Sequence, residues 1–72
     1  MQTTTKQETF ERAMRVTLGV KANGGSVAIQ VKMGDIWLTS DTISTDGVYP
    51  LDIPQATVRF VPSGSAAFEV FA

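Results

Sequence analysis

The chain contains neither cysteine nor histidine among its 72 residues. Without cysteine it can form no disulfide and no thiolate metal site, and without histidine it lacks the commonest acid–base catalyst near neutral pH. A serine or threonine nucleophile would have only lysine or a carboxylate as its base. We therefore expect a protein that is not an enzyme and that needs no metal and no cofactor.

The chain has neither an excess of charge of one sign nor a long apolar run. Six Lys and Arg residues face seven Asp and Glu residues, giving a net charge of -1. Because no basic cluster is present to neutralise phosphates, we expect no nucleic-acid partner. No run approaches the roughly 18 apolar residues that indicate a membrane span, and residues 1–8 lack the apolar region of a signal peptide. The expectation is a protein made in a cytoplasm, with no signal peptide and no membrane partner.

The small size predicts one domain that associates with other chains. A composition of 43% hydrophobic and 18% charged residues is that of a globular protein. A single core in a chain this short rarely supplies more than about 3–5 kcal/mol of stability, and disulfides cannot add to it. We therefore expect a homo-oligomer or attachment to a larger surface.

Alternation of apolar and polar residues predicts an all-β protein. Val27, Ile29, Val31 and Met33 share one face of residues 26–33, and turn signals recur about every ten residues. Such spacing is typical of a small antiparallel β-sandwich or barrel of five to six short strands. The strands are expected at residues 10–20, 26–33, 36–39, 41–45, 56–61 and 66–71, and residues 48–54, with two prolines, as an edge strand or connection.

The first nine residues are polar and contain three consecutive threonines. We expect residues 1–9 to form an arm that is flexible when free, and residues 10–72 to form the single β domain. The arm residues expected to dock on a partner are Thr3, Thr4, Thr5 and Lys6. A capping box of Thr5 and Glu8, which would open a short helix through Met14, is the alternative.

The last two strands are predicted to pair as a hairpin with apolar character on both faces. Val58, Phe60, Phe68 and Val70 would face the core. The outer face, the candidate self-association surface, would carry Arg59, Val61, Ala67, Glu69 and Phe71. Arg59 and Glu69 would then form a cross-strand ion pair. This pair would either contribute only to the pairing of the two strands or set the register of a subunit interface. Alternatively, Phe71 folds over the end of its own core.

Trp37 lies between Ile36 and Leu38 and must face away from both on a strand. It either caps one end of the core, with its indole N–H bonded to a carbonyl, or offers an exposed recognition platform for a sugar or a protein. The four aspartates of residues 35–52 fit turns better than calcium, because their spacing matches no calcium loop.

Four segments together resemble the small β-sandwich virion proteins of tailed bacteriophages. They read VAIQVK, then GD-x-WLT, then DTI-x-x-DGVY, then ATVRFVPSGSAAFEV, and they lie within residues 25–71. Proteins of this kind decorate capsids, form head fibres or act as tail knobs, commonly as trimers. The resemblance implies a structural virion protein, with a trimer as the favoured oligomer.

Three functional hypotheses follow. The first is a capsid decoration or cement protein that stabilises the particle through its N-terminal arm and a self-associating β domain, with a larger capsid or virion protein as partner. The alternative is a fibre or tail recognition module that binds host surface carbohydrate or protein through Trp37. The third is a free cytoplasmic protein that inhibits a host enzyme.

Overall fold

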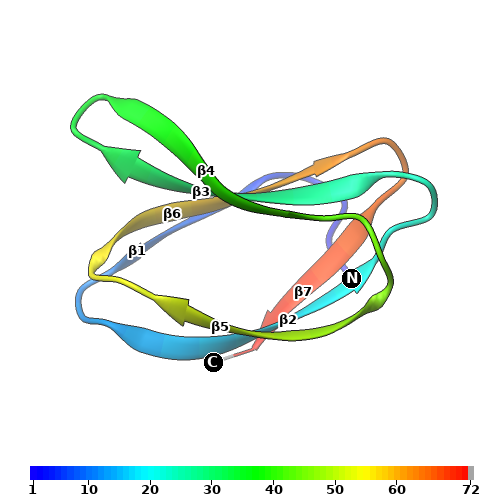
Figure 1. Ribbon diagram of the computed structural model, residues 1–72, viewed down its shortest axis with the longest axis horizontal. Helices are drawn as coiled ribbons and strands as arrows, with labels where there is room; N and C mark the ends of the chain where they lie inside the picture. The colour runs from blue at the N-terminus through cyan, green and yellow to red at the C-terminus, as the bar shows by residue number, and fades with distance from the viewer. Residues whose placement is uncertain (72) are drawn as a thin grey trace.

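A computed structural model describes residues 1–71, which form seven antiparallel strands and no helix (Figure 1). The all-β architecture expected from the sequence, a small antiparallel sandwich, is confirmed, with seven strands in place of five or six. The strands are β1 (Lys6–Phe10), β2 (Met14–Lys21), β3 (Ser26–Met33), β4 (Ile36–Ile43), β5 (Gly47–Ile53), β6 (Ala56–Ser63) and β7 (Ala67–Phe71).

The strands form a four-stranded sheet in the order β1-β6-β3-β4 and a three-stranded sheet in the order β5-β2-β7. Only β3 and β4 are consecutive in both sequence and sheet. Every other connection between the seven strands passes from one sheet to the other, as Figure 1 shows for the turns at either end. Most pairing partners are therefore far apart in the sequence.

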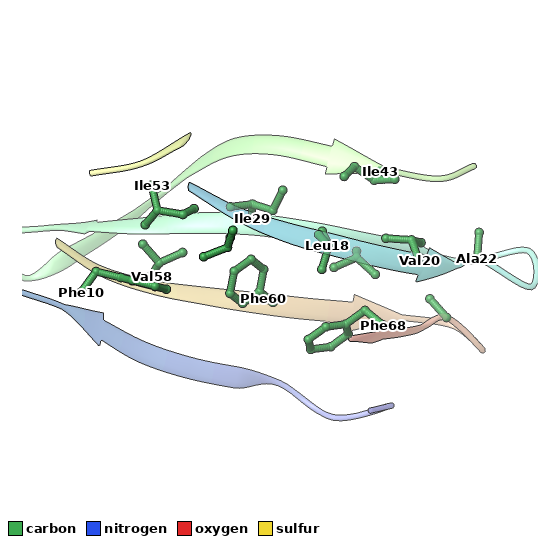
Figure 2. Packing of buried hydrophobic residues seen from close by; sticks show 13 residues of the cluster. Phe10, Leu18, Val20, Ala22, Ile29, Ile43, Ile53, Val58, Phe60 and Phe68 are labelled. Atoms are coloured by element: carbon green, nitrogen blue, oxygen red, sulfur yellow. The ribbon is translucent and has the colours of Figure 1, made fainter. Parts of the chain in front are cut away.

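The core consists of apolar side chains from the facing sides of the two sheets (Figure 2). Phe60 of β6 and Phe68 of β7 are completely buried, and their ring centroids lie 5.9 Å apart. The remaining buried side chains are Phe10, Val16, Leu18, Val20, Ala22, Val27, Ile29, Ile43, Ile53, Val58 and Ala66. The predicted core residues Val58, Phe60 and Phe68 are confirmed, and Val70 packs against the core while partly exposed.

Two turns meet at one end of the sandwich. Asn23 and Gly24 have φ of 50° and 84°, and the amide of Gly25 donates to the carbonyl of Ala22 over 2.7 Å. The backbone of Gly25 approaches the carbonyl of Ser63 so closely that a Cβ on Gly25 would lie 2.0 Å from this oxygen. Glycine is therefore required at position 25 by the contact between turns, and it is favoured at position 24 by the left-handed conformation.

The N-terminal segment differs from the expected arm. Residues 6–10 form β1, which pairs with β6 along its whole length, and the backbone of Gln2 exchanges hydrogen bonds of 2.7 and 2.9 Å with Phe68. Residues 6–9 thus belong to the β domain, and the short helix from Thr5 is wrong. The cause is that an edge strand needs backbone pairing on one side and only one buried side chain, here Phe10. Polarity alone could not distinguish it from an arm.

Strand pairing also differs from the prediction at the C-terminal end. β6 pairs with β1 and β3, whereas β7 pairs with β2 in the other sheet. The predicted hairpin is wrong because the turn at residues 63–66 passes between sheets. In addition, residues 36–39 and 41–45 were expected as two strands, but β4 runs through Ile43 with a register shift opposite Ile29 and Gln30.

Candidate functional site

The outer face of the four-stranded sheet gathers Trp37 and Arg59. We call this surface the Trp37–Arg59 face and define it by the register of β1, β6, β3 and β4. Its residues are Gln7, Thr9, Ser26, Ala28, Gln30, Lys32, Trp37, Thr39, Thr42, Thr57, Arg59, Val61 and Ser63. The structure therefore places Trp37 away from the core, and the interpretation of Trp37 as a core cap is wrong.

Trp37 and Arg59 contact each other across the central strand β3. The guanidinium carbon of Arg59 lies 4.2 Å from the centroid of the indole ring, a cation–π arrangement. The Nε of Arg59 donates to Oε1 of Gln30, and Nε2 of Gln30 donates to Oγ1 of Thr39 over 3.2 Å. Trp37 and Arg59 are both half-buried. A chain of contacts thus fixes the guanidinium and the indole in one orientation.

The charge on this face is of one sign. Arg59 and Lys32, which is opposite Trp37 in the register, are its two cations. None of the thirteen positions of the face is Asp or Glu, although the whole chain has a net charge of -1. The remaining polar groups on the face are hydroxyls and amides, including the Thr9 and Thr57 hydroxyls 3.1 Å apart. The face is therefore locally cationic and rich in neutral hydrogen-bonding groups.

A second surface lies at the end of the β3–β4 hairpin, which projects beyond the rest of the sandwich in Figure 1. Met33, Ile36 and Leu38 are 55%, 55% and 49% exposed, and we call them the hairpin-end patch. In the register these side chains share the sheet face that carries Val27 and Ile29 into the core. The patch is thus the uncovered continuation of the core face.

The edges of the two sheets differ in how well they are protected from pairing. β5 carries Pro50, β7 is covered at Phe68 by Gln2, and β1 is short and carries Lys6 and Glu8. Proline, charge and short length are the usual means of blocking an edge strand.

The edge of β4 is blocked over only part of its length. The register shift near Ser40 interrupts the strand, and the Asp41 carboxylate accepts from the amide of Thr42 over 2.8 Å. Residues 36–39 contain no proline and no charged residue. The unprotected stretch therefore coincides with Ile36 and Leu38 of the hairpin-end patch.

The predicted self-association surface does not form one stripe. Arg59 and Val61 lie on the outer face of the four-stranded sheet, whereas Ala67, Glu69 and Phe71 lie on the outer face of the three-stranded sheet. The predicted ion pair between Arg59 and Glu69 is wrong, because the two residues lie on the outer faces of different sheets. Glu69 instead lies 3.9 Å from the N-terminal ammonium.

Phe71 lies on the outer face of its own sheet. Its side chain is 50% exposed, and its Cε2 would be 3.7 Å from a Cβ on Gly19. The alternative in which Phe71 folds over the core is therefore also wrong. The role of these five residues in self-association stays a prediction.

The threonines of the expected arm are exposed. Thr3, Thr4 and Thr5 lie between Gln2, which bridges to β7, and Lys6, whose Nζ is 3.7 Å from Glu8 Oε1. They are accessible to a partner surface while the segment is anchored at both ends. Docking through these threonines and Lys6 stays a prediction.

The aspartates make local contacts. Asp46 accepts from the amide of Ala22 over 2.7 Å, and Asp52 lies 3.0 Å from the Nε of Arg15. The hydrogen bond that the Arg15 guanidinium donates to Asp52, and then the negative charge of Asp52, raise the pKa of the guanidinium above its ordinary value. Within residues 1–71 no three acidic side chains converge in a way that could hold a metal ion.

A polar hollow of about 270 Å³ lies at the end of β4. Its lining comprises Asp41, Thr42, Ile43, Ser44, Thr45 and Tyr49. The Tyr49 hydroxyl donates to the carbonyl of Thr45 over 2.6 Å, so two of the lining residues are bonded to each other.

No protein family, no curated protein and no solved structure matches this chain in sequence or in fold. In the described part of the chain no helix could cross a membrane. The candidate functional surfaces of the protein are the Trp37–Arg59 face and the β4 edge with its hairpin-end patch.

Proposed function

We propose that this protein is a structural component of a virus particle, a capsid decoration or cement protein that strengthens a larger assembly by self-association. The observation that carries self-association is the unprotected β4 edge at residues 36–39 beside the exposed Ile36 and Leu38. The virion assignment is supported by the resemblance of the strand sequences to phage β-sandwich proteins.

A two-fold antiparallel pairing of β4 with β4 of a second copy fits this edge. With Trp37 at the two-fold axis, Ile36 lies opposite Leu38 of the partner subunit, and Leu38 lies opposite Ile36 of the partner subunit. Both apolar pairs then bring Ile36 and Leu38 of the hairpin-end patch into contact, while the backbone groups of residues 36–39 that point to the free edge gain partners. The two four-stranded sheets become one continuous sheet of eight strands.

The pairing is short and is expected to be weak between free molecules. Cross-strand side-chain pairs contribute only about 0.2–1 kcal/mol each, whereas a millimolar Kd already requires about 4 kcal/mol, so affinity near the millimolar range is expected. On a particle, each copy is also held by a capsid subunit, and a neighbour is present at high effective concentration. Weak contacts repeated over a particle surface then strengthen the whole assembly.

Leu38→Asp is expected to abolish this self-association. An ionised carboxylate beside Ile36 of the partner subunit would lose water without gaining a partner. Light scattering and sedimentation over micromolar to millimolar concentrations should show the wild-type protein forming dimers and the variant remaining a monomer. Val48→Asp is the matched control, because Val48 is 71% exposed on β5 of the other sheet.

Two results would contradict the β4 pairing. One is a wild-type monomer at millimolar concentration, and the other is an equal loss of association in Leu38→Asp and Val48→Asp. A trimer, as the resemblance implies, would require head-to-tail contact in place of the two-fold pairing, and the measured mass distinguishes the two arrangements.

The virion role is tested with particles. Particles that lack the protein should assemble but rupture at lower temperature, and added wild-type protein should restore their resistance while Leu38→Asp restores less. Particles of normal resistance that fail to adsorb to cells would replace this proposal with the recognition module. Absence of the protein from purified particles would overturn both roles.

A further inference from the structure

We infer that the Trp37–Arg59 face binds acidic carbohydrate, a sugar that carries a carboxylate or a phosphate group. This inference goes beyond the structural role proposed above and requires only one copy of the chain. It rests on the fixed guanidinium, on the surrounding hydroxyl and amide groups, and on the sign of the charge.

Arg59 is held ready to bind an anion. Its Nε donates to Gln30, and its guanidinium lies over the Trp37 ring, so much of its side-chain freedom is already lost before a ligand arrives. Within residues 1–71 neither Nη nitrogen of Arg59 has a protein acceptor, and no carboxylate is paired with it. A planar guanidinium fork with two available nitrogens matches a carboxylate or a phosphate with two hydrogen bonds.

The groups around Arg59 suit the neutral part of a sugar. Thr57 and Thr9 lie along β6 and β1 on one side of Arg59, and Gln30 and Thr39 lie on the other side. Hydroxyls and amides both donate and accept hydrogen bonds, as sugar hydroxyls require. Because the Arg59 guanidinium covers one face of the Trp37 indole, the C–H groups of a sugar ring would pack against the rest of this ring, the one aromatic surface of the face.

The charges of the Trp37–Arg59 face favour a small anionic ligand. Lys32 adds a second cation opposite Trp37, and no carboxylate on the face opposes an approaching anion. A nucleic acid is less well matched, because its affinity comes from many phosphate contacts and from stacking on several aromatics, whereas this face has two cations and one aromatic. An acidic sugar needs only one fork and one ring platform.

The test uses Trp37 itself, since it is the only tryptophan of the chain. The wild-type protein is titrated with glucuronate, with N-acetylneuraminate, with glucose 6-phosphate and with glucose, while Trp fluorescence and amide chemical shifts are recorded. We expect saturable binding of the acidic sugars in the millimolar range, at least about tenfold weaker binding of glucose, and weakening by added salt. The carboxylate and phosphate probes show which anion is preferred.

Two variants test the role of the Arg59 guanidinium. Arg59→Lys keeps the positive charge but removes the planar guanidinium, and Arg59→Gln removes the charge as well as the guanidinium. Both variants should bind the acidic sugars at least about tenfold more weakly than wild type. Arg15→Gln is the matched control, because Arg15 is an exposed arginine on the outer face of the three-stranded sheet and should leave binding unchanged. Thermal unfolding of each variant verifies that the fold is intact.

Four outcomes would overturn the inference. They are no saturable response to any acidic sugar, equal binding of glucose, unchanged binding in Arg59→Gln, and shifts centred on the three-stranded sheet. Tighter binding of a single-stranded oligonucleotide than of the sugars would assign the face to nucleic acid instead. The Leu38→Asp variant should be a monomer and should still bind acidic sugars as tightly as the wild-type protein does. Failure of self-association and failure of sugar binding can therefore be distinguished.

Discussion

Phe60→Ala is expected to leave most of the protein unfolded at room temperature. Phe60 is completely buried between the sheets, with its ring 5.9 Å from that of Phe68 (Figure 2). Truncation of a buried phenylalanine costs about 3–5 kcal/mol, which is as much as a domain of this size usually has. Far-UV circular dichroism and urea titration should show a cooperative transition for the wild-type protein and its loss in the variant.

Phe71→Ala is the matched control for this prediction. Phe71 is also a phenylalanine on a strand, but it is 50% exposed on the outer face of β7. Its loss should change the free energy of unfolding by about 1 kcal/mol or less. Both variants should be measured in the monomeric Leu38→Asp background, because self-association would add stability. Equal losses in the two variants would show that the core is not where the structure places it.

The buried face of the central strands was predictable because its signal is local. Alternation along residues 26–33 and 56–61 assigns Val27, Ile29, Val58 and Phe60 to one side, and the structure buries all four. In a strand the side chains alternate regardless of which strand lies alongside. The fold class therefore follows from the sequence before any pairing is known.

The pairing of strands could not be derived in the same way. A tight turn at residues 63–66 is compatible with a hairpin and equally with a connection between the two sheets. In the structure the turn connects the sheets and contacts Gly25, a residue distant in the sequence. β1 shows the same limitation, because its pairing with β6 uses backbone groups that carry no sequence signature. A polar segment at the edge of a sheet therefore resembles an unattached arm.

The candidate site was predictable only in its parts. Trp37 and Arg59 both stood out in the sequence, Trp37 for recognition and Arg59 for an ion pair with Glu69. Their contact requires β3 to lie between β4 and β6, an order set by long-range pairing. The open β4 edge likewise depends on which strand lies at the end of the sheet. In the sequence Ile36 and Leu38 resemble ordinary core residues of a strand, and only the structure shows that the other sheet does not cover them.

Gly25→Ala is expected to separate the two turns that close one end of the sandwich. The new Cβ would lie 2.0 Å from the Ser63 carbonyl oxygen and 3.0 Å from the carbonyl carbon, and backbone atoms cannot rotate out of the way. Overpacking of this kind costs about 3 kcal/mol, enough to remove most of the stability of a small domain. Urea titration should show the loss, and shifted amide signals at residues 63–66 should locate it.

Gly24→Ala separates this steric effect from backbone strain. Gly24 has φ of 84°, yet no atom lies within 4 Å of where its Cβ would be. Alanine there should cost about 1 kcal/mol through its left-handed conformation and leave the amide signals of residues 63–66 in place. A larger loss of stability in Gly24→Ala than in Gly25→Ala would show that glycine is needed in the β2–β3 turn for its backbone conformation and not for the contact with Ser63.

Gly25→Ala should also disturb the site on the outer face of the four-stranded sheet. β3 pairs with β6 beside the contact between the turns, where the Ser26 and Ser63 hydroxyls lie 2.9 Å apart. A shift of this pairing would change the register that brings Arg59 beside Gln30.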